Sequence, residues 1–406
     1  MITTPKSLRL QIALFGRTNA GKSTFLNMVA GQDVAITSPL AGTTTDVVEK
    51  PMELLPLGPV VFLDTPGYGD TTELGEKRIA RARKIFERAD VVTLLCEANV
   101  WGEPEEELLA EAQSHNRPVI GVITKTDLTP PAPEFLELLS GKGIAHLLLS
   151  APGKREQVLA DFKGELIRVV PEDFLMPPPL LGDLIPRGGC VLLIVPIDLQ
   201  APKGRLILPQ VQAIRDALDH EASVIVVKEE GFLPMLEKLK TPPDLVVCDS
   251  QVVKRMVTEI PPEIPCTTFS ILFARMKGDL ETQVKGAAAI RTLKPGDRVL
   301  IAEACTHHAA EDDIGRVKIP NLLKKYAGGD LQITVCSGRD YPADLAEYKL
   351  IVHCGGCMFN RAEILSRFQA AERAGVPITN YGVAISFVSG VLKQVLKPFP
   401  SASKWI

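Results

Sequence analysis

The stretch that most constrains the fold of this chain is GRTNAGKS, residues 16–23. It fits the pattern G-x-x-x-x-G-K-[ST] and lies between an apolar run, residues 10–15, and a stretch with a helical pattern, as a phosphate-binding loop requires. Gly16 and Gly21 let the backbone curl so that its N–H groups face phosphate oxygens at a helix N-terminus. The motif therefore predicts an α/β fold with a P-loop, against the alternative of a glycine-rich turn that carries a surface lysine.

Side chains in and after this loop predict how triphosphate and magnesium are bound. Lys22 would neutralise the β- and γ-phosphates, and the Ser23 hydroxyl would ligate Mg²⁺. In VVFLDTPGYGD, Asp64 ends an apolar strand and can hold Mg²⁺ through water, while the amide of Gly67 can meet the γ-phosphate. These residues predict hydrolysis of the bound triphosphate.

The loop SPLAGTTTD, residues 38–46, lies between these two motifs. A threonine there can cap Mg²⁺ and report the γ-phosphate; we expect Thr44, with Thr43 as the next choice. The alternative is a polar surface loop. Lys22, Thr44, Asp64 and Gly67 are thus the predicted catalytic residues.

Two later strand ends predict that the base is guanine. GVITKTDL brings Thr124, Lys125 and Asp127 to the end of a strand, and LLLSAPG brings Ser150 and Ala151. A carboxylate at Asp127 can accept from both N1–H and N2–H of guanine, whereas adenine would leave it unpaired. The residues predicted to contact GTP or a bound monovalent cation are Gly16, Asn19, Ala20, Gly21, Lys22, Ser23, Thr24, Thr124, Lys125, Asp127, Ser150 and Ala151.

The motifs GRTNAGKS, AGTTTD, DTPGYGD and TKTD together resemble the G domains of the TrmE and Era class of GTPases, over residues 8–170. The resemblance implies that Asn19 binds K⁺ beside the phosphates, so that the ion does the work of an arginine finger. Local hydrogen bonding within the loop is the alternative for Asn19. Tyr68 stands where Ras-like proteins place a water-orienting Gln, which implies slow intrinsic hydrolysis. We therefore expect a GTPase that K⁺ stimulates.

The length of the chain, 406 residues, predicts several domains. We expect a P-loop GTPase domain at 1–170, a linker rich in Pro and Gly at 171–189, an α/β dimerisation domain at 190–265 and an α/β domain with a metal site at 266–406. Downstream of the linker, apolar runs such as CVLLIVPI and DLVVCDS alternate with amphipathic stretches, which predicts parallel sheets with crossover helices. A small sheet often gains stability by pairing, and this is the basis of the dimerisation hypothesis.

The seven cysteines after the linker divide into two groups. Cys190, Cys248 and Cys266 lie in or beside predicted strands, where we expect buried apolar residues. The stretches DRVLIAEACTHH, DLQITVCSGRD and YKLIVHCGGC carry the other group, which follows apolar runs. Because the carboxyl ends of parallel strands meet at one edge of a sheet, we expect these ends to converge.

Cys305, Cys354 and Cys357 can then offer three thiolates to one site, with His307 and His353 nearby. Three thiolates with an adjustable fourth position suit a 4Fe-4S cluster, because one iron stays open to exchangeable ligands. A zinc site, a redox-active dithiol and simple buried cysteines remain alternatives. His308 is expected at the surface and Cys336 in the core.

Cys-x-His followed by His-Cys-x-x-Cys, in a chain that opens with a TrmE-like G domain, resembles the HydF family of FeFe-hydrogenase maturation GTPases. The resemblance implies a dimeric scaffold whose Cys305, Cys354 and Cys357 hold a 4Fe-4S cluster, with His307 and His353 as candidates for further ligands. It also implies the partners HydE and HydG, radical-SAM enzymes that help to make a two-iron precursor, and the apo-hydrogenase HydA, which receives it.

Composition bears on partners and location. A formal net charge of −4 gives no drive toward nucleic acid, and we expect neither nucleic acid nor membrane as a partner. The N-terminal residues lack a small-residue cleavage site and we expect a cytoplasmic protein. The competing hypothesis is a tRNA-modification or ribosome-assembly GTPase of the TrmE/Era class with a metal-binding C-terminal domain; a redox sensor is a third.

Overall fold

The computed structural model describes residues 5–31, 48–68, 84–149, 155–176, 178–197, 206–304 and 313–406. The chain forms two compact units, residues 1–177 and 178–406. Each unit is an α/β structure built on parallel sheets, which confirms the predicted fold class. No helix within the described ranges is long and apolar enough to cross a membrane.

Unit 1 contains a six-stranded sheet in the order β2-β3-β1-β4-β5-β6, in which only the β2–β3 pair is antiparallel among the described pairs. Every residue of β1 is buried, as expected of a central parallel strand with helices on both faces. The strands are β1 (Leu10–Gly16), β2 (Val48–Leu54), β3 (Gly58–Asp64), β4 (Val91–Glu97), β5 (Val119–Thr124) and β6 (Ala145–Leu148).

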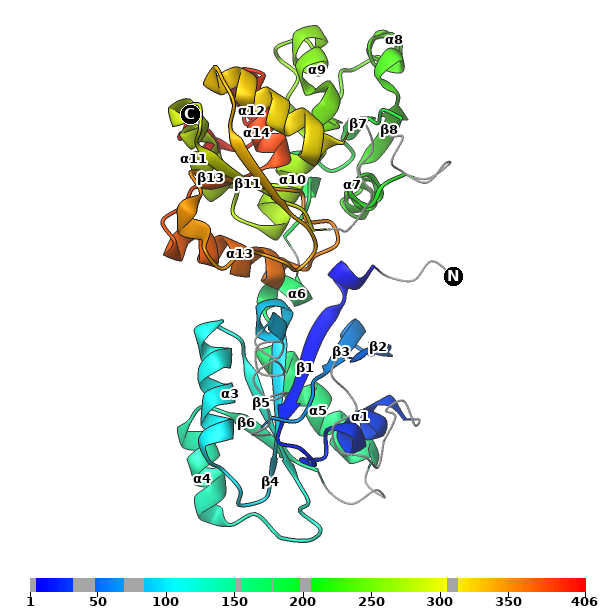
Figure 1. The fold of residues 1–406 in the computed structure, drawn as a ribbon. Coiled ribbons are helices and arrows are strands. Elements are labelled where there is room, and N and C mark those ends of the chain that lie inside the picture. Colours follow the sequence, from blue (N-terminus) through cyan, green and yellow to red (C-terminus); the bar gives the residue numbers. More distant parts are fainter. Residues whose placement is uncertain are drawn as a thin grey trace. The chain divides into compact units, whose positions relative to one another are not determined.

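Helices cover both faces of this sheet, as Figure 1 shows for α1 and α5 on one face and α3 and α4 on the other. Phe25 of α1 and Phe162 of α5 pack edge to face in the core on the first side. Phe15 of β1 stacks on Phe86 in the core on the second. The helices are α1 (Lys22–Ala30), α3 (Glu103–Ser114), α4 (Pro133–Gly141), α5 (Arg155–Val169) and α6 (Glu172–Leu175).

Unit 2 contains two parallel four-stranded sheets, in the orders β10-β9-β7-β8 and β12-β11-β13-β14. The runs predicted as strands in residues 190–265 form β7, β8 and β9, which confirms that part of the reading. The strands are β7 (Cys190–Ile194), β8 (Ser223–Val227), β9 (Leu245–Cys248), β10 (Cys266–Thr268), β11 (Arg298–Ala302), β12 (Gln332–Cys336), β13 (Leu350–His353) and β14 (Ile378–Asn380).

The helices of unit 2 join the two sheets through one continuous core. Leu192 of β7 and Val299 of β11 belong to the same buried cluster, and α10 packs against both α7 and α14. Asp279 caps α11 by accepting from the amide of Glu281 at 2.9 Å. The helices are α7 (Leu208–Asp219), α8 (Phe232–Lys238), α9 (Val253–Glu259), α10 (Phe269–Lys277), α11 (Leu280–Ala288), α12 (Ile319–Ala327), α13 (Arg361–Arg373), α14 (Tyr381–Val388), α15 (Leu392–Val395) and α16 (Pro400–Ser403).

Short turns of 3₁₀ or π helix complete the described chain. They are η1 (Lys6–Leu8), η3 (Gly182–Leu184), η4 (Glu229–Gly231), η5 (Ser250–Val252), η6 (Ala289–Thr292), η7 (Ile314–Lys318) and η8 (Leu345–Glu347).

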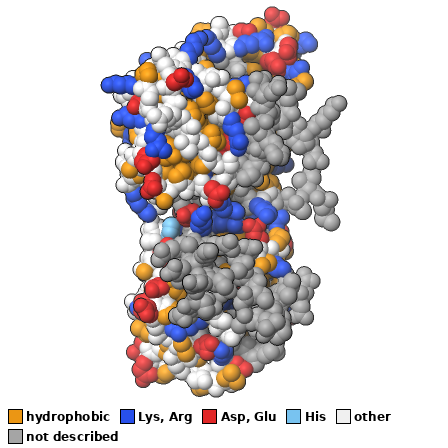
Figure 2. Space-filling model, in the orientation of Figure 1, with side chains coloured by type: hydrophobic (Ala, Val, Ile, Leu, Met, Phe, Trp, Pro, Cys, Tyr) orange, Lys and Arg blue, Asp and Glu red, His pale blue; other side chains and the backbone are white. Residues whose placement is uncertain are grey.

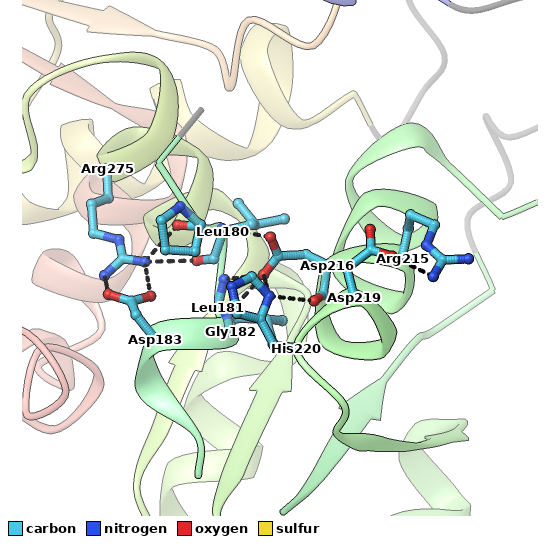
Figure 3. Close-up of polar contacts among 10 residues, drawn as sticks. Leu180, Leu181, Gly182, Asp183, Arg215, Asp216, Asp219, His220 and Arg275 are labelled. Carbon is cyan, nitrogen blue, oxygen red and sulfur yellow. Dashed lines mark hydrogen bonds and ion pairs between the residues drawn. The ribbon is translucent and has the colours of Figure 1, made fainter. Parts of the chain in front are cut away.

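The segment that enters unit 2 is held by charged side chains (Figure 3). The carboxylate of Asp216, on α7, accepts from the amides of residues 180–182 at 2.8–3.1 Å. Arg275, on α10, pairs with Asp183 at 2.6 Å and donates to the carbonyl of Pro179 at 2.8 Å. Although the composition of this stretch predicts a linker, residues 179–183 make specific polar contacts with helices of unit 2.

Candidate functional site

The phosphate-binding loop connects β1 to α1 through two glycines with unusual backbone angles. Gly16 has φ +153° and Gly21 has φ +86°. A β-carbon on Gly16 would lie 2.4 Å from the carbonyl oxygen of Leu95, so this position admits only glycine. Asn19 also has a positive φ, +64°, and is exposed, whereas Ala20 is buried. The loop therefore has the tight curl that the motif predicts.

Lys22 and Asp64 place opposite charges at this edge of the sheet. The Lys22 ammonium donates to the carbonyls of Gly16 and Arg17, each at 2.9 Å. Burial lowers the pKa of Lys22 to about 8, although the negative charge of Asp64 acts to raise it. Burial also raises the pKa of Asp64, and Lys22 opposes that shift. Asp64 pairs with Leu14 in the register of β3 and β1, so the structure brings both predicted catalytic groups to one place.

The segment after β3 lies directly against the phosphate loop. The amide of Tyr68 donates to the carbonyl of Gly16 at 3.0 Å. A β-carbon on Gly67 would lie 2.4 Å from the hydroxyl oxygen of Thr18, so Gly67 allows this close approach. The backbone at Gly67 therefore lies against the phosphate loop, and contact of its amide with a γ-phosphate stays a prediction.

Helix α3 supports both segments, a feature that the sequence reading missed. Glu105 is 1% exposed and pairs through both oxygens with Arg17, at 2.6 and 2.7 Å. Glu107 accepts from the Tyr68 hydroxyl at 2.5 Å. The acidic first turn of α3 was visible in the sequence, but its partners lie far away in the chain. α3 thus connects the phosphate loop to the start of the segment that follows Gly67.

The predicted guanine-binding residues follow β5. Thr124 packs on the phosphate loop, since a β-carbon on Gly21 would lie 3.4 Å from its methyl group. Lys125 has φ +55° and pairs with Glu97, while Asp127 is exposed at the loop that follows. Thr124 therefore lies against the phosphate loop, and guanine recognition by Lys125 and Asp127 stays a prediction. Thr44, Ser150 and Ala151 lie outside the described residues.

A second site lies at the carboxyl ends of β11 and β13, which are neighbours with Ala302 opposite His353. The Cys354 sulfur accepts from the amide of Ala304 at 3.0 Å and from that of Gly356 at 3.4 Å. Such N–H···S bonds stabilise a thiolate and tune the clusters that thiolates hold. Cys305, the next residue after Ala304, and His307 lie outside the described residues, as does His308.

The loop from Cys354 to Cys357 turns at Gly356. This residue has φ +61°, and a β-carbon there would lie 2.4 Å from a side-chain carbon of Ile364. The positive φ favours glycine here, and a larger residue would also have to displace the end of the Ile364 side chain. A β-carbon on Gly355 would have no atom within 4 Å, so a side chain could be accommodated at Gly355 more easily than at Gly356.

Lys277 lies beneath this loop, although it is about 80 residues away in sequence. It is 4% exposed, and its ammonium donates to the carbonyls of Gly356, Cys357 and Phe359. Burial lowers the pKa of Lys277 to about 8, while Cys357 and Cys354 act in the opposite direction. A buried cation therefore lies next to the cysteine loop, and no local sequence motif predicts it.

His353 points into the protein in this structure. It is 1% exposed; its Nδ1 lies 2.6 Å from the carbonyl oxygen of Cys354, and its Nε2 lies 3.1 Å from the guanidinium of Arg367. Burial, followed by the charge of Arg367, lowers the pKa of His353 to about 3. The neutral ring therefore donates from Nδ1 and accepts at Nε2. Arg367 itself lies over the rings of Tyr341 and Phe359, at 4.7 and 4.5 Å.

Of the other cysteines after the linker, Cys248 and Cys266 are buried as expected, whereas Cys190 and Cys336 are half-buried. Burial raises the pKa of the Cys248, Cys266 and Cys190 thiols. Cys336 ends β12 opposite Ala302 and packs at the edge of an apolar cluster.

The cysteine loop fits a thiolate-held cluster. It offers two half-buried sulfurs, amide donors to one of them, and a buried ammonium close by. Within the described ranges alone, no three Cys, His, Asp or Glu side chains are grouped to hold a metal ion. The predicted set requires Cys305, which follows the last described residue of the β11 end.

Family comparisons match three parts of the chain. Residues 11–125 match the family described as 50S ribosome-binding GTPase. Residues 180–278 match the hydrogen maturase F dimerization domain, and residues 281–398 match the hydrogen maturase F tetramerization domain. The two hydrogen maturase F matches together span nearly all of unit 2.

Individual relatives match the G-domain region. The tRNA modification GTPase MnmE of Paraburkholderia xenovorans is 38% identical over 161 residues, which is 39% of this chain and 34% of that protein. The MnmE of Burkholderia thailandensis is 36% identical over 162 residues, again 39% and 34% of the two chains. The chain thus spans about a third of the length of these curated relatives.

A solved structure of Era from Aquifex aeolicus, bound to GDP and AlF4⁻, is 24% identical, with a TM-score of 0.35 over 54% of this chain and 94% of that one. The G domain of the FeoB iron transporter from T. maritima is 23% identical, with a TM-score of 0.31 over 40% of this chain and 98% of that one.

Proposed function

The chain belongs to the hydrogen maturase F family, and from this premise we propose that it is a GTP-hydrolysing scaffold and carrier in the assembly of the FeFe-hydrogenase active site. It holds a 4Fe-4S cluster, receives a two-iron precursor made with the radical-SAM enzymes HydE and HydG, and delivers that precursor to apo-hydrogenase HydA. The observation that carries this proposal is the Cys354 sulfur, which accepts two backbone amides at a strand end within the matched region.

Cys305, Cys354 and Cys357 are the proposed cluster ligands. When bound, a cluster held by three thiolates supplies one iron that is open to exchangeable ligands. His307 is a candidate for a further ligand. His353 would reach iron only after it gives up its bond to Arg367 or to the Cys354 carbonyl, so its role in the described arrangement is to support the loop.

The chain would bind GTP and Mg²⁺ at the P-loop. Lys22 contacts the β- and γ-phosphates, Ser23, Thr44 and Asp64 hold Mg²⁺, and Gly67 reads the γ-phosphate. The residues proposed to contact the nucleotide or K⁺ are Gly16, Asn19, Ala20, Gly21, Lys22, Ser23, Thr24, Thr124, Lys125, Asp127, Ser150 and Ala151. We expect hydrolysis to be faster in K⁺ than in Na⁺, and an Asn19→Ala variant to lose this difference. Equal wild-type rates in the two salts would contradict the role of Asn19.

The sheet edges of unit 2 are proposed to mediate oligomerisation, which the names of both matched families suggest. β8 lies at the edge of its sheet and exposes 44% of Val226; Leu218 of α7 is 47% exposed. An edge strand offers unpaired N–H and C=O groups to a second strand. We expect Val226→Lys to convert dimers to monomers in sedimentation velocity, whereas Val335→Lys, on the β12 edge of the other sheet, should leave the dimer intact.

Anaerobic reconstitution with iron and sulfide tests the scaffold function. We expect the wild-type chain to show the EPR signal of a reduced 4Fe-4S cluster and, after incubation with HydE and HydG, to activate apo-HydA. A chain that binds no cluster, or that activates no hydrogenase, would contradict the proposal. Partner affinity measured with GDP and with a non-hydrolysable GTP analogue then tests the switch, since equal affinities would exclude it.

The competing hypothesis of an RNA-directed GTPase rests on the G-domain matches, which cover 39% of the chain. On the face drawn in Figure 2, Lys and Arg side chains lie among acidic and apolar ones. RNA recognition favours clustered basic side chains. Tight binding of tRNA or ribosomal RNA that depends on the RNA sequence would favour this alternative, whereas we expect no such binding.

A further inference from the structure

The feature that the proposed function does not use is Lys277, the last residue of α10. Its ammonium lies 3.0 Å from the carbonyl oxygen of Gly356, 3.3 Å from that of Cys357 and 2.8 Å from that of Phe359. Only 4% of Lys277 is exposed. An ammonium has three N–H donors, and burying it is unfavourable unless all of them are used. The cysteine loop supplies the three acceptors.

We propose that Lys277 is a positioning residue of the cysteine loop. It fixes the backbone of residues 356–359 and places one positive charge beside the sulfurs of Cys354 and Cys357. This inference rests on the proposed role of the loop as a cluster site, and it assigns to α10 a part in that site.

Three backbone bonds to one rigid donor restrict the loop more than any single contact could. The loop makes few regular backbone bonds of its own, among them the amide of Phe359 to the carbonyl of Gly356 at 3.0 Å. The carbonyls of Gly356 and Phe359 face the buried Lys277, where no water would replace a lost donor. Removing the ammonium takes a donor from the buried carbonyls of Phe359 and Gly356, of which Gly356 keeps the amide of Phe359. The loss destabilises the loop in the conformation that presents both sulfurs.

The turn that carries Lys277 is itself held from two other elements. Arg361, the first residue of α13, donates to the carbonyls of Met276 at 2.7 Å and Gly278 at 3.2 Å. Gln283 of α11 donates to the carbonyl of Ala274 at 3.1 Å. Since the end of α10 is fixed in this way, Lys277 acts as an anchor for the loop rather than a side chain that follows it.

The same helical turn also holds the segment that enters unit 2. Arg275, two residues before Lys277, pairs with Asp183 and donates to the carbonyls of Pro179 and Leu180 (Figure 3). All of α10 lies in the match to the dimerization domain, which ends at residue 278, whereas the cysteine loop lies in the match to the tetramerization domain. Through Lys277, the region that matches the dimerization domain therefore contacts the cysteine loop in the region that matches the tetramerization domain.

The charge of Lys277 should act on a bound cluster as well as on the loop. A cluster held by thiolates becomes more negative when it is reduced, so a cation nearby favours the reduced form and raises the reduction potential. A neutral side chain at this position should lower that potential. A purely structural role would leave the potential of the clusters that do assemble unchanged.

The test compares Lys277→Met and Lys277→Gln in the full chain. Met removes both the charge and the donors, while Gln removes the charge and keeps an N–H donor. Lys254→Met, an exposed lysine of α9, is the matched control. The first measurement is amide hydrogen exchange of the metal-free protein in the peptide that covers residues 354–360. The second is the midpoint potential after anaerobic reconstitution with ferrous iron and sulfide.

We expect exchange in this peptide to be about tenfold faster in Lys277→Met than in wild type or in Lys254→Met, with a smaller increase in Lys277→Gln. Both Lys277 variants should have a more negative potential than the control. Unchanged exchange in Lys277→Met would overturn the positioning role, and an unchanged potential in both variants would overturn the electrostatic role. If Lys277→Met does not fold, Lys277→Gln alone decides both points.

The two proposals fail in distinguishable ways. A wild-type chain that binds no cluster would overturn the proposed function and, with it, the electrostatic role of Lys277. The exchange measurement uses metal-free protein, so it would still decide whether Lys277 positions the loop.

Discussion

The two candidate sites of this chain each have a buried lysine that donates to backbone carbonyls of a glycine-containing loop. Lys22 donates to Gly16 and Arg17, and Lys277 donates to Gly356, Cys357 and Phe359. Burial lowers the pKa of each lysine to about 8. In both sites the loop follows the carboxyl end of a parallel strand, β1 or β13. The physical device is the same, although the chemistry differs.

The difference between the sites lies in where the lysine comes from. Lys22 belongs to the same eight-residue motif as its loop, so one turn of chain brings them together. Lys277 ends a helix that precedes the cysteine loop by about 80 residues, and packing of α10 on α13 and α14 brings it into place. A local motif specifies the phosphate loop and its lysine. The second site depends on the tertiary structure of all of unit 2.

The largest effect should come from Lys22→Met. The variant loses the charge that stabilises the transferring phosphate, so we expect kcat for GTP hydrolysis to fall by about 10³-fold. Phosphate release in K⁺ and Mg²⁺ measures it, with Lys254→Met as the control. Because the two sites lie in separate units, cluster binding should be unchanged. A fall of less than threefold in kcat would exclude Lys22 from catalysis.

Asp127→Asn should change which base is bound, with a smaller effect. An amide cannot accept from both N1–H and N2–H of guanine, so affinity for GTP should fall by about 10²-fold. Xanthosine triphosphate has an oxygen where guanine has the amino group, and it should bind the variant better than GTP. Calorimetric titration with both nucleotides measures this. Unchanged GTP affinity would show that Asp127 does not read the base.

Cys354→Ser tests whether the cysteine loop can lose its function without affecting GTP hydrolysis. A hydroxyl does not ionise as a thiol does, so we expect iron bound after reconstitution to fall by about tenfold, with loss of the EPR signal. Cys190→Ser, a half-buried cysteine outside the loop, is the control. GTP hydrolysis should stay within twofold of wild type. A full cluster in Cys354→Ser would refute the ligand assignment.

The smallest effect concerns the acid stability of unit 1. Burial alone would raise the pKa of Glu49. Hydrogen bonds from Lys6 and Arg88 outweigh this effect and lower the pKa to about 2, from an ordinary value of 4.5. The unfolded chain therefore binds a proton that the folded chain does not between these two pH values. The stabilisation by Glu49 is complete above pH 4.5 and is lost as the pH falls toward 2.

We expect Glu49→Gln to lower the free energy of unfolding of unit 1 by about 1–2 kcal/mol at pH 7 and by almost nothing near pH 2. The value at pH 7 is smaller than the full pKa shift implies, because solvent screens Lys6, which is 71% exposed. Hydrogen exchange in β1 and β3 at several pH values measures it. Glu53→Gln, exposed on the same strand, is the control. Equal effects at both pH values would show that ionisation of Glu49 is not the cause.

Local patterns in the sequence predicted the architecture well. Continuous apolar runs such as CVLLIV predicted buried parallel strands, and the structure has β7 there. The rule that parallel strand ends converge predicted that the ends of β11 and β13 meet, and the register of Ala302 with His353 agrees with it.

By itself, then, the sequence determined the sheets, the phosphate loop and the identity of the thiol-bearing strand ends, because each depends on residues close together in the chain. Only the tertiary structure decided that Lys277 lies under the cysteine loop, that Glu105 holds Arg17, and that His353 turns inward to Arg367. Those contacts join residues that are distant in sequence or, for His353, depend on which side of a strand is buried. Burial of a charged side chain is stable only where packing supplies its partners, and no local pattern specifies that packing.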